Sequence, residues 1–283
     1  MKKLVLFTVA LLIVLALVSL MIALFQKGGV PIGDKVALVR VEGPIIDSKS
    51  AADEIREYAK DASIKAIVLR VDSPGGAVAP SQEIYEEVKK ATAKKKVVVS
   101  MGSLAASGGY YISSPASRIV ANPGTLTGSI GVIMEIPNIE GLMSKVGVKT
   151  EVIKSGRHKD IASMFRGIGK EERAILQGVL DDVHEQFIES VAEGRKMPAG
   201  EVRKLADGRI FTGRQALGTG LVDELGNLDD AVKAAAKLSG IKGEPEVVTK
   251  KEKLSFIDLL RGKFPKELSD IFPSVRIKYV FSP

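Results

Sequence analysis

The sequence contains no cysteine and no tryptophan, and only two of its 283 residues are histidines. Without cysteine the chain has no disulfide, no thiolate nucleophile and no cysteine-ligated zinc or iron–sulfur site. The sequence also shows no cluster of metal ligands and no phosphate-binding loop, so we expect no metal and no other cofactor. The missing cysteine leaves the compartment open, because many exported proteins also lack it.

A strong excess of one charge is also missing. The formal net charge is +7, and the lysines and arginines are mostly interleaved with aspartates and glutamates. Proteins that bind nucleic acid more often gather their basic residues into one patch or stripe. We therefore expect a solvated surface that tolerates anionic lipid headgroups, and no nucleic-acid partner.

The longest hydrophobic run lies at the N-terminus. Leu4–Phe25 carries no charge and is long enough to cross ~30 Å of hydrocarbon as a helix. Lys2 and Lys3 precede it and only Lys27 follows closely, which by the positive-inside rule leaves the N-terminus in the cytoplasm. A cleaved secretory signal is the alternative, but its apolar region spans about 7–15 residues and ends in a small-x-small site. We favour a retained single-pass anchor over 1–27 in the cytoplasmic (inner) membrane, with the remaining chain on the outer, periplasmic face.

A glycine- and proline-containing linker, 28–35, separates this anchor from a folded domain at 36–242. Short apolar runs alternate with helical patterns in that domain, which predicts an α/β fold with parallel strands. The pattern weakens afterwards, so 243–283 is expected to be a C-terminal extension. The predicted strands are 36–41, 66–71, 97–99, 118–121, 129–134 and 148–154, and the predicted helices are 50–60 (capped by Ser50), 81–94, 139–146, 170–195 and 228–239.

The stretch Met101–Tyr111 places one serine among small neighbours. Two alanines precede Ser107, and Gly108 and a second glycine follow it. A serine nucleophile needs an exposed hydroxyl at a tight turn and a nearby backbone N–H for the developing oxyanion, which Gly108 is placed to offer. A glycine turn with a buried, hydrogen-bonded serine is the commoner interpretation of such a stretch by itself.

A second glycine turn, Asp72–Gly76, follows the predicted strand 66–71. Ligands in α/β sheets bind beyond the carboxyl ends of the strands, and glycines there let the backbone approach a substrate closely. Alone, this segment is typical of a plain turn. Together, the two turns are able to form an oxyanion hole from Gly75 or Gly76 with Gly108.

These residues resemble the signal peptide peptidase A family. The resemblance is carried by Asp-Ser-Pro-Gly-Gly at 72–76, Ala-Ala-Ser-Gly-Gly-Tyr-Tyr at 105–111 and Thr-Leu-Thr-Gly-Ser-Ile-Gly-Val at 125–132. The three motifs occur in the family's order and spacing, and the resemblance extends over 36–235. It implies a membrane-anchored serine protease with a Clp-protease/crotonase-like ββα superhelix, in the short, single-repeat form of the family.

The resemblance further implies a Ser–Lys dyad, with Ser107 as nucleophile. The base maps to Lys159, in the segment Lys-Ser-Gly-Arg-His-Lys-Asp at 154–160. A Ser-His-Asp triad would need a histidine, and His158 is the rival base, ranked below Lys159 on the family match alone. His184 lies in the long predicted helix 170–195 and is expected on the surface.

A lysine acts as a base only when it is neutral, so its pKa must fall several units from about 10.4. Burial and neighbouring cations both lower it. Asp160 would oppose this effect if its carboxylate pointed toward the amine.

The sequence therefore predicts a membrane-anchored serine endopeptidase that degrades cleaved signal peptides or other apolar peptides in the membrane. A related protease that cuts an intact membrane-protein partner is the first alternative; a crotonase-like acyl-CoA-binding protein and a non-catalytic membrane scaffold are less favoured. Clp-type folds form rings, and a single repeat would regain its missing half by association. We therefore expect a homo-oligomeric ring with the site at or near a subunit contact.

Overall fold

The computed structural model describes residues 14–15, 34–250 and 277–280. The predicted anchor helix over 4–25 lies outside these residues except for positions 14 and 15, and so does most of the linker. Within the described part of the chain, no helix is long and apolar enough to cross a membrane.

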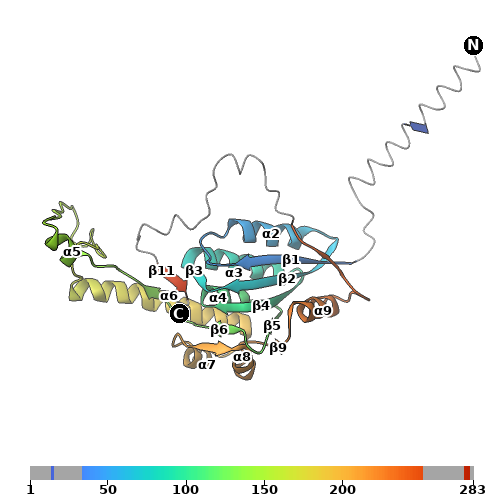
Figure 1. The fold of residues 1–283 in the computed structure, drawn as a ribbon. Coiled ribbons are helices and arrows are strands. Elements are labelled where there is room, and N and C mark those ends of the chain that lie inside the picture. The colour runs from blue at the N-terminus through green and yellow to red at the C-terminus, as the bar shows by residue number, and fades with distance from the viewer. Residues whose placement is uncertain (1–13, 16–33, 251–276, 281–283) are drawn as a thin grey trace, which may run out of the picture.

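The body of the protein is a mixed sheet with a parallel centre (Figure 1). Its order is β10-β1-β2-β4-β5-β9 with every neighbouring pair parallel, while β6 runs parallel to the end of β4 and antiparallel to β8. This arrangement confirms the α/β class predicted from the alternation of apolar runs and helical patterns. The strands are β1 (Lys35–Glu42), β2 (Ile64–Ser73), β4 (Lys96–Ala106), β5 (Arg118–Ala121), β6 (Leu126–Gly128), β8 (Ile210–Thr212), β9 (Glu224–Leu225) and β10 (Glu246–Val248).

Helices cover both faces of this sheet. Successive side chains of a strand point to opposite faces, and those of β1 are apolar on both, so each face needs helices to bury it. Val36 and Leu38 of β1 pack in one apolar cluster with Ala235 of α9, whereas Val39 packs in the other with Ile55 of α2. Helices α2, α3, α4 and α6 contribute to the second cluster. The helices are α2 (Lys49–Lys60), α3 (Val78–Thr92), α4 (Gly108–Ser113), α5 (Glu140–Lys145), α6 (Lys170–Arg195), α7 (Ala199–Leu205), α8 (Gly213–Thr219) and α9 (Leu228–Leu238).

A second, three-stranded sheet lies beside the first and brings the C-terminal segment into the body. β11 (Ile277–Val280) lies between β3 (Gly75–Ala77) and β7 (Ile133–Met134) and is antiparallel to both (Figure 1). The sequence analysis assigned no strand to any part of 243–283. β10 and β11 both come from that segment.

Two predicted strands are absent or shorter. No strand forms over 148–154, where every residue is exposed; that prediction was wrong because an extended segment needs a neighbouring strand for its backbone hydrogen bonds. The strand predicted at 129–134 is reduced to β7. Gly128 and Ser129 have φ values of 78° and 50°, in the left-handed region, and therefore interrupt extended backbone.

Two helices also start earlier than predicted. α2 begins at Lys49 with Ser48 as its N-cap residue, so the predicted cap at Ser50 was wrong. The Ser48 side chain caps no backbone N–H and instead hydrogen-bonds the Glu83 carboxylate on α3. α3 begins at Val78, directly after β3 ends at Ala77. The second glycine turn is therefore followed at once by a helix, with no loop between them.

Candidate active site

The two glycine turns follow neighbouring parallel strands and meet at one edge of the sheet. β2 leads through Pro74 into β3, and β4 leads through Ser107 into α4. The approach is close: a Cβ atom added to Gly108 would lie 3.1 Å from the Cα of Gly75 and 3.2 Å from the backbone nitrogen of Gly76. The structure thus brings together Ser107, Gly108, Gly75 and Gly76, as a site built from both turns requires.

Ser107 occupies a strained turn between strand and helix. Its φ of 54° and ψ of −119° lie in a region that non-glycine residues rarely adopt. Such a conformation costs of order 1–3 kcal/mol and persists only where the surroundings fix it. Here the Ser107 N–H donates to the Gly128 carbonyl oxygen over 2.8 Å, and the Ser107 carbonyl accepts the Tyr111 N–H over 2.8 Å.

The hydroxyl of Ser107 is buried and has no hydrogen-bond partner among the described residues. Most buried polar side-chain atoms do have one, so an unpaired oxygen here needs an explanation. The missing partner excludes the hydrogen-bonded turn residue, but the burial also contradicts the exposed hydroxyl that we expected of a nucleophile at this turn. A strained serine with a free Oγ beside glycine backbone is chemically suited to attack a carbonyl group.

Lys159 lies elsewhere in the same chain. It is exposed, in a loop attached to the first turn of α6, where His158 Nε2 lies 3.5 Å from Glu171 Oε1. From Glu171 to Phe187 the helix rises about 24 Å. At that distant part α6 packs against Tyr111 of α4, with the Phe187 and Tyr111 ring centroids 4.9 Å apart and the Ser190 and Tyr111 hydroxyl oxygens 2.8 Å apart. The structure therefore joins neither Lys159 nor His158 to Ser107 within one chain.

The Asp160 carboxylate is bound by two cations. It accepts a hydrogen bond from Arg166 Nε over 2.9 Å and pairs with the Lys154 amine. The Arg166 guanidinium, followed by Lys154, holds the pKa of Asp160 well below its usual range. The sequence analysis missed Arg166, which falls just beyond the matched segment 154–160.

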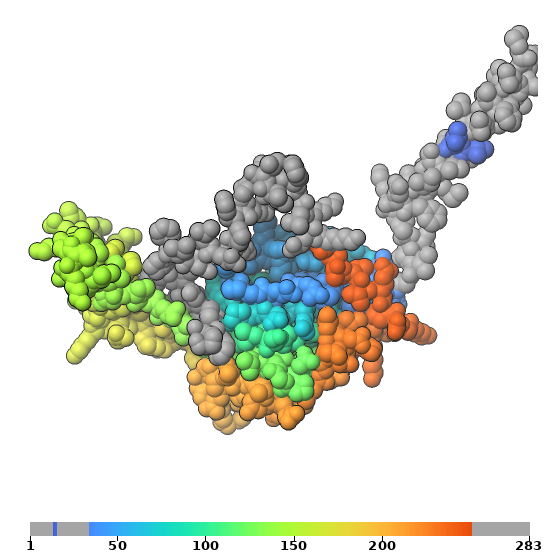
Figure 2. Space-filling model, viewed as in Figure 1, coloured from blue at the N-terminus to red at the C-terminus, as the bar shows by residue number. Residues whose placement is uncertain are grey.

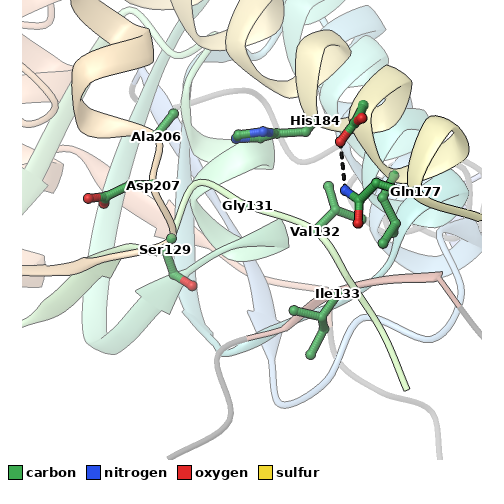
Figure 3. A pocket seen from close by; sticks show the side chains of 11 residues that line it. Ser129, Gly131, Val132, Ile133, Gln177, His184, Ala206 and Asp207 are labelled. Atoms are coloured by element: carbon green, nitrogen blue, oxygen red, sulfur yellow. Dashed lines mark hydrogen bonds between the residues drawn. The ribbon is translucent and has the colours of Figure 1, made fainter. Parts of the chain in front are cut away.

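His184 lies in the wall of a cavity of about 570 Å³, in contrast to the predicted surface position (Figure 3). The side chain is half-buried, and its Nε2 has no hydrogen-bond partner within the described ranges. Ser129, Gly131 and Ile133 line the cavity from the segment that includes β7. Ser129 was not singled out from the sequence, although it lies inside the motif at 125–132.

Comparisons with known proteins agree with these features. The sequence matches the family model of peptidase family S49 over residues 89–242 and that of Clp protease over residues 40–124. A putative protease of Synechocystis is 47% identical over 208 residues, which cover 73% of this chain and 75% of that protein.

Two further relatives are longer than the matched region. Protease 4 of Salmonella typhi is 41% identical over 74% of this chain, but the match spans only 35% of that protein. A putative signal peptide peptidase of Enterococcus faecium is 39% identical over 65% of this chain and 54% of its own length. The mixed sheet, the Ser107 turn and these matches together establish that the chain belongs to peptidase family S49, the signal peptide peptidase A family, and is a serine peptidase.

Proposed function

We propose that this protein is a membrane-anchored endopeptidase that degrades cleaved signal peptides with a Ser107–Lys159 dyad. The observation that carries the proposal is the strained Ser107, whose hydroxyl has no partner in the described part of the chain and lies where the two glycine turns meet. Ser107 Oγ attacks the peptide carbonyl carbon while its proton passes to neutral Lys159. The N–H groups of Gly108 and of Gly75 or Gly76 hold the oxyanion.

The remaining steps use the same groups. The carbon–nitrogen bond breaks as Lys159 returns the proton to the leaving amine, and Ser107 is left as an ester of the acyl fragment. Water then attacks that ester, giving its proton to Lys159, and the proton returns to Ser107 Oγ as the acid leaves. No cofactor takes part in these steps.

The lysine of each site comes from a second copy of the chain. Lys159 is exposed on the projecting segment that carries α5, which Figure 1 shows at the outer end of α6. Figure 2 shows this segment standing out from the body of the protein. Among the described residues, the segment and the adjacent part of α6 expose large apolar side chains, an arrangement typical of an interface. The exposed apolar residues are Leu142, Val146, Val148, Val152, Ile153, Phe165, Ile175 and Val179, and Ile153 is 97% exposed.

Association also supplies what the base requires. Ser107 is already buried within one chain, and a second copy packed over Lys159 would remove water from its amine and favour the neutral form. The expected ring of identical chains therefore completes each site and dehydrates it in one step.

The second sheet supports an extended peptide as substrate. Strand β11 pairs with the turn that contains the oxyanion glycines, with Val280 opposite Gly75 and Tyr279 opposite Gly76. Its other edge pairs with Ile133 and Met134 of β7. A peptide bound in this slot gains backbone hydrogen bonds on both sides whatever its sequence, as in other complexes formed by strand addition. Apolar signal peptides suit such a slot because they need few polar side-chain contacts.

The membrane assignment depends on Leu4–Phe25 and on the lysines that precede it. A protease-protection assay on intact spheroplasts tests the orientation. We expect the region from Val36 onward to be accessible from outside, and protection of that region would contradict the outer-face location.

Mixing two inactive variants tests the shared dyad. Ser107→Ala and Lys159→Ala are each expected to be inactive alone. Under conditions that permit subunit exchange, a Ser107→Ala chain still offers Lys159 to the intact Ser107 of the other variant, so peptidase activity should return. No return of activity, with exchange confirmed independently, would show that each chain completes its own dyad. A fully active Lys159→Ala homo-oligomer would refute Lys159 as the base.

A further inference from the structure

Arg166 uses every N–H of its guanidinium group. Nε donates to Asp160 Oδ2 over 2.9 Å, and Nη1 donates to Glu172 Oε2 over 2.7 Å and to the Gly167 carbonyl over 3.0 Å. Nη2 donates to Glu172 Oε1 and, over 3.2 Å, to the Asp160 carbonyl. A guanidinium has five N–H donors in a fixed planar fork, and all five are engaged here.

These bonds connect the residue that follows Lys159 to the first turn of α6. Asp160, the residue after Lys159, is held by both its side chain and its carbonyl oxygen, and that carbonyl also accepts the Ser163 N–H over 3.0 Å. Glu172 lies in the first turn of α6 and accepts the Gly169 N–H over 3.1 Å. The side chains of Asp160 and Glu172 are only 13% and 11% exposed, although the loop around them is largely exposed.

We propose that Arg166 is a positioning residue for Lys159, because it fixes the lysine loop to α6 and engages the carboxylates of Asp160 and Glu172. The inference rests on the proposed role of Lys159 as the base. The first consequence is geometric. Without the guanidinium, the backbone of Asp160 and the start of α6 lose the side chain that binds them both. Its second consequence is electrostatic, because a freed carboxylate beside Lys159 would favour the charged amine, which is not a base.

The other charges around Lys159 do not replace Arg166. Lys154 is a second cation on Asp160, but an ammonium group cannot bridge Asp160 and Glu172 through a planar fork. Arg157 and His158 face Glu171 on α6. The packed elements also carry Lys170 at the start of α6 and Glu140 of α5, which accepts the Gly167 N–H over 3.0 Å.

The primary test is Arg166→Gln in the full-length oligomer, assayed on an apolar fluorogenic peptide across pH. We expect kcat to fall by about 10²-fold, the loss typical of a catalytic group misplaced by about 1 Å, while KM stays within about twofold. We also expect the acid limb of the kcat/KM profile to move to higher pH. Arg203→Gln is the matched control, because Arg203 also forms a bidentate pair, with Glu185, but on α7. It should leave kcat, KM and the pH profile unchanged.

Two more variants separate geometry from charge. Arg166→Gln leaves Asp160 and Glu172 without their guanidinium partner, and adding Asp160→Asn removes the carboxylate that is adjacent to Lys159 in the sequence. The acid limb should then return part of the way toward its wild-type position while kcat stays low. Arg166→Lys keeps a cation but loses the fork, so it should lower kcat and leave the acid limb near wild type. If Arg166→Gln does not assemble, the kcat of Arg166→Lys tests the positioning role by itself. A wild-type kcat in Arg166→Lys overturns the proposal.

Different results would contradict the positioning role of Arg166 and the Ser107–Lys159 dyad. Wild-type kcat and pH profile in a folded, assembled Arg166→Gln oligomer overturn the positioning role. If Lys159→Ala is inactive in the same assay, the dyad still stands. An active Lys159→Ala oligomer removes the dyad itself, whatever the result at Arg166.

Discussion

Gly108 lies so close to Gly75 that a Cβ atom on Gly108 would stand 3.1 Å from the Gly75 Cα, and 2.7 Å from the Ser81 hydroxyl oxygen. The two residues belong to turns that are separated in the sequence by helix α3 and most of β4. Their contact defines one backbone surface beside Ser107, so a change in either turn alters the same site.

We expect Gly108→Ala to lower kcat by about 10²–10³-fold, comparable to the loss of one oxyanion-hole donor. The new methyl group must displace the Ser81 hydroxyl, which would lie 2.7 Å away, and it crowds the Gly75 and Gly76 backbone at 3.1 and 3.2 Å, where atoms cannot rotate away as a side chain can. Steady-state kinetics and a thermal melt of the same sample separate this effect from unfolding. Gly124→Ala is the control, since a Cβ there meets no atom within 4 Å. Wild-type kcat in Gly108→Ala would argue against an oxyanion hole at this position.

We expect Ser107→Ala to abolish peptidase activity and labelling by a serine-reactive fluorophosphonate, whereas Ser103→Ala keeps most of both. Ser103 lies on the same strand, four residues before Ser107, but it is exposed and stands outside the strained turn. The measurement is probe labelling followed by identification of the modified peptide. A label found on Ser103, or equal loss in both variants, would overturn the assignment of the nucleophile.

Strand β11 should compete with substrate, because it pairs with the glycine turn that the scissile peptide must approach. Deleting residues 277–283 is expected to lower KM for an extended peptide by roughly 10-fold without reducing kcat, since a tethered competitor acts at an effective concentration on the order of mM. Deleting only 281–283 keeps the paired strand and should have a much smaller effect. An unchanged KM after the longer deletion would mean that β11 does not occupy the substrate slot during turnover.

Glu172 should make the lysine loop sensitive to acid. Hydrogen bonds from Arg166, and then from the Gly169 N–H, lower the pKa of Glu172 to about 2, whereas a glutamate in an unfolded chain titrates near 4.3. A lowered pKa stabilises the folded state above pH about 4.3, and this contribution is lost as the pH falls toward about 2. Glu172→Gln should therefore lower Tm at neutral pH, and the difference from wild type should shrink as the solution is acidified.

Glu171→Gln is the matched control for that measurement. Glu171 is the preceding residue, and its side chain is 52% exposed, so its ion pairs are screened by solvent. We expect a much smaller change in Tm at neutral pH. A pH-independent difference between Glu172→Gln and wild type would show that the effect comes from packing instead of charge.

The sequence by itself determined the α/β class, the long helix Lys170–Arg195 and the two glycine turns. These features depend on local patterns. Buried parallel strands appear in the sequence as apolar runs, and glycine marks positions where the backbone must turn or must approach another group closely. The motifs around Ser107 also identified the family, because they combine unusual residue types in a fixed order.

Only the tertiary structure decided how these parts meet. The contact of Gly108 with Gly75 and the pairing of β11 with β3 both join residues that are distant in the chain, and no local pattern specifies such a contact. Only the fold shows that the buried Ser107 hydroxyl has no hydrogen-bond partner within the described ranges. The segment 148–154 has the composition of a strand, yet it stays irregular because no neighbouring strand accepts its backbone hydrogen bonds. Likewise, the motif predicts Lys159 as the base, but the fold decides where this lysine lies. Arg166 pairs with Asp160 and with Glu172, which attaches the lysine loop to the start of α6 and separates it from Ser107.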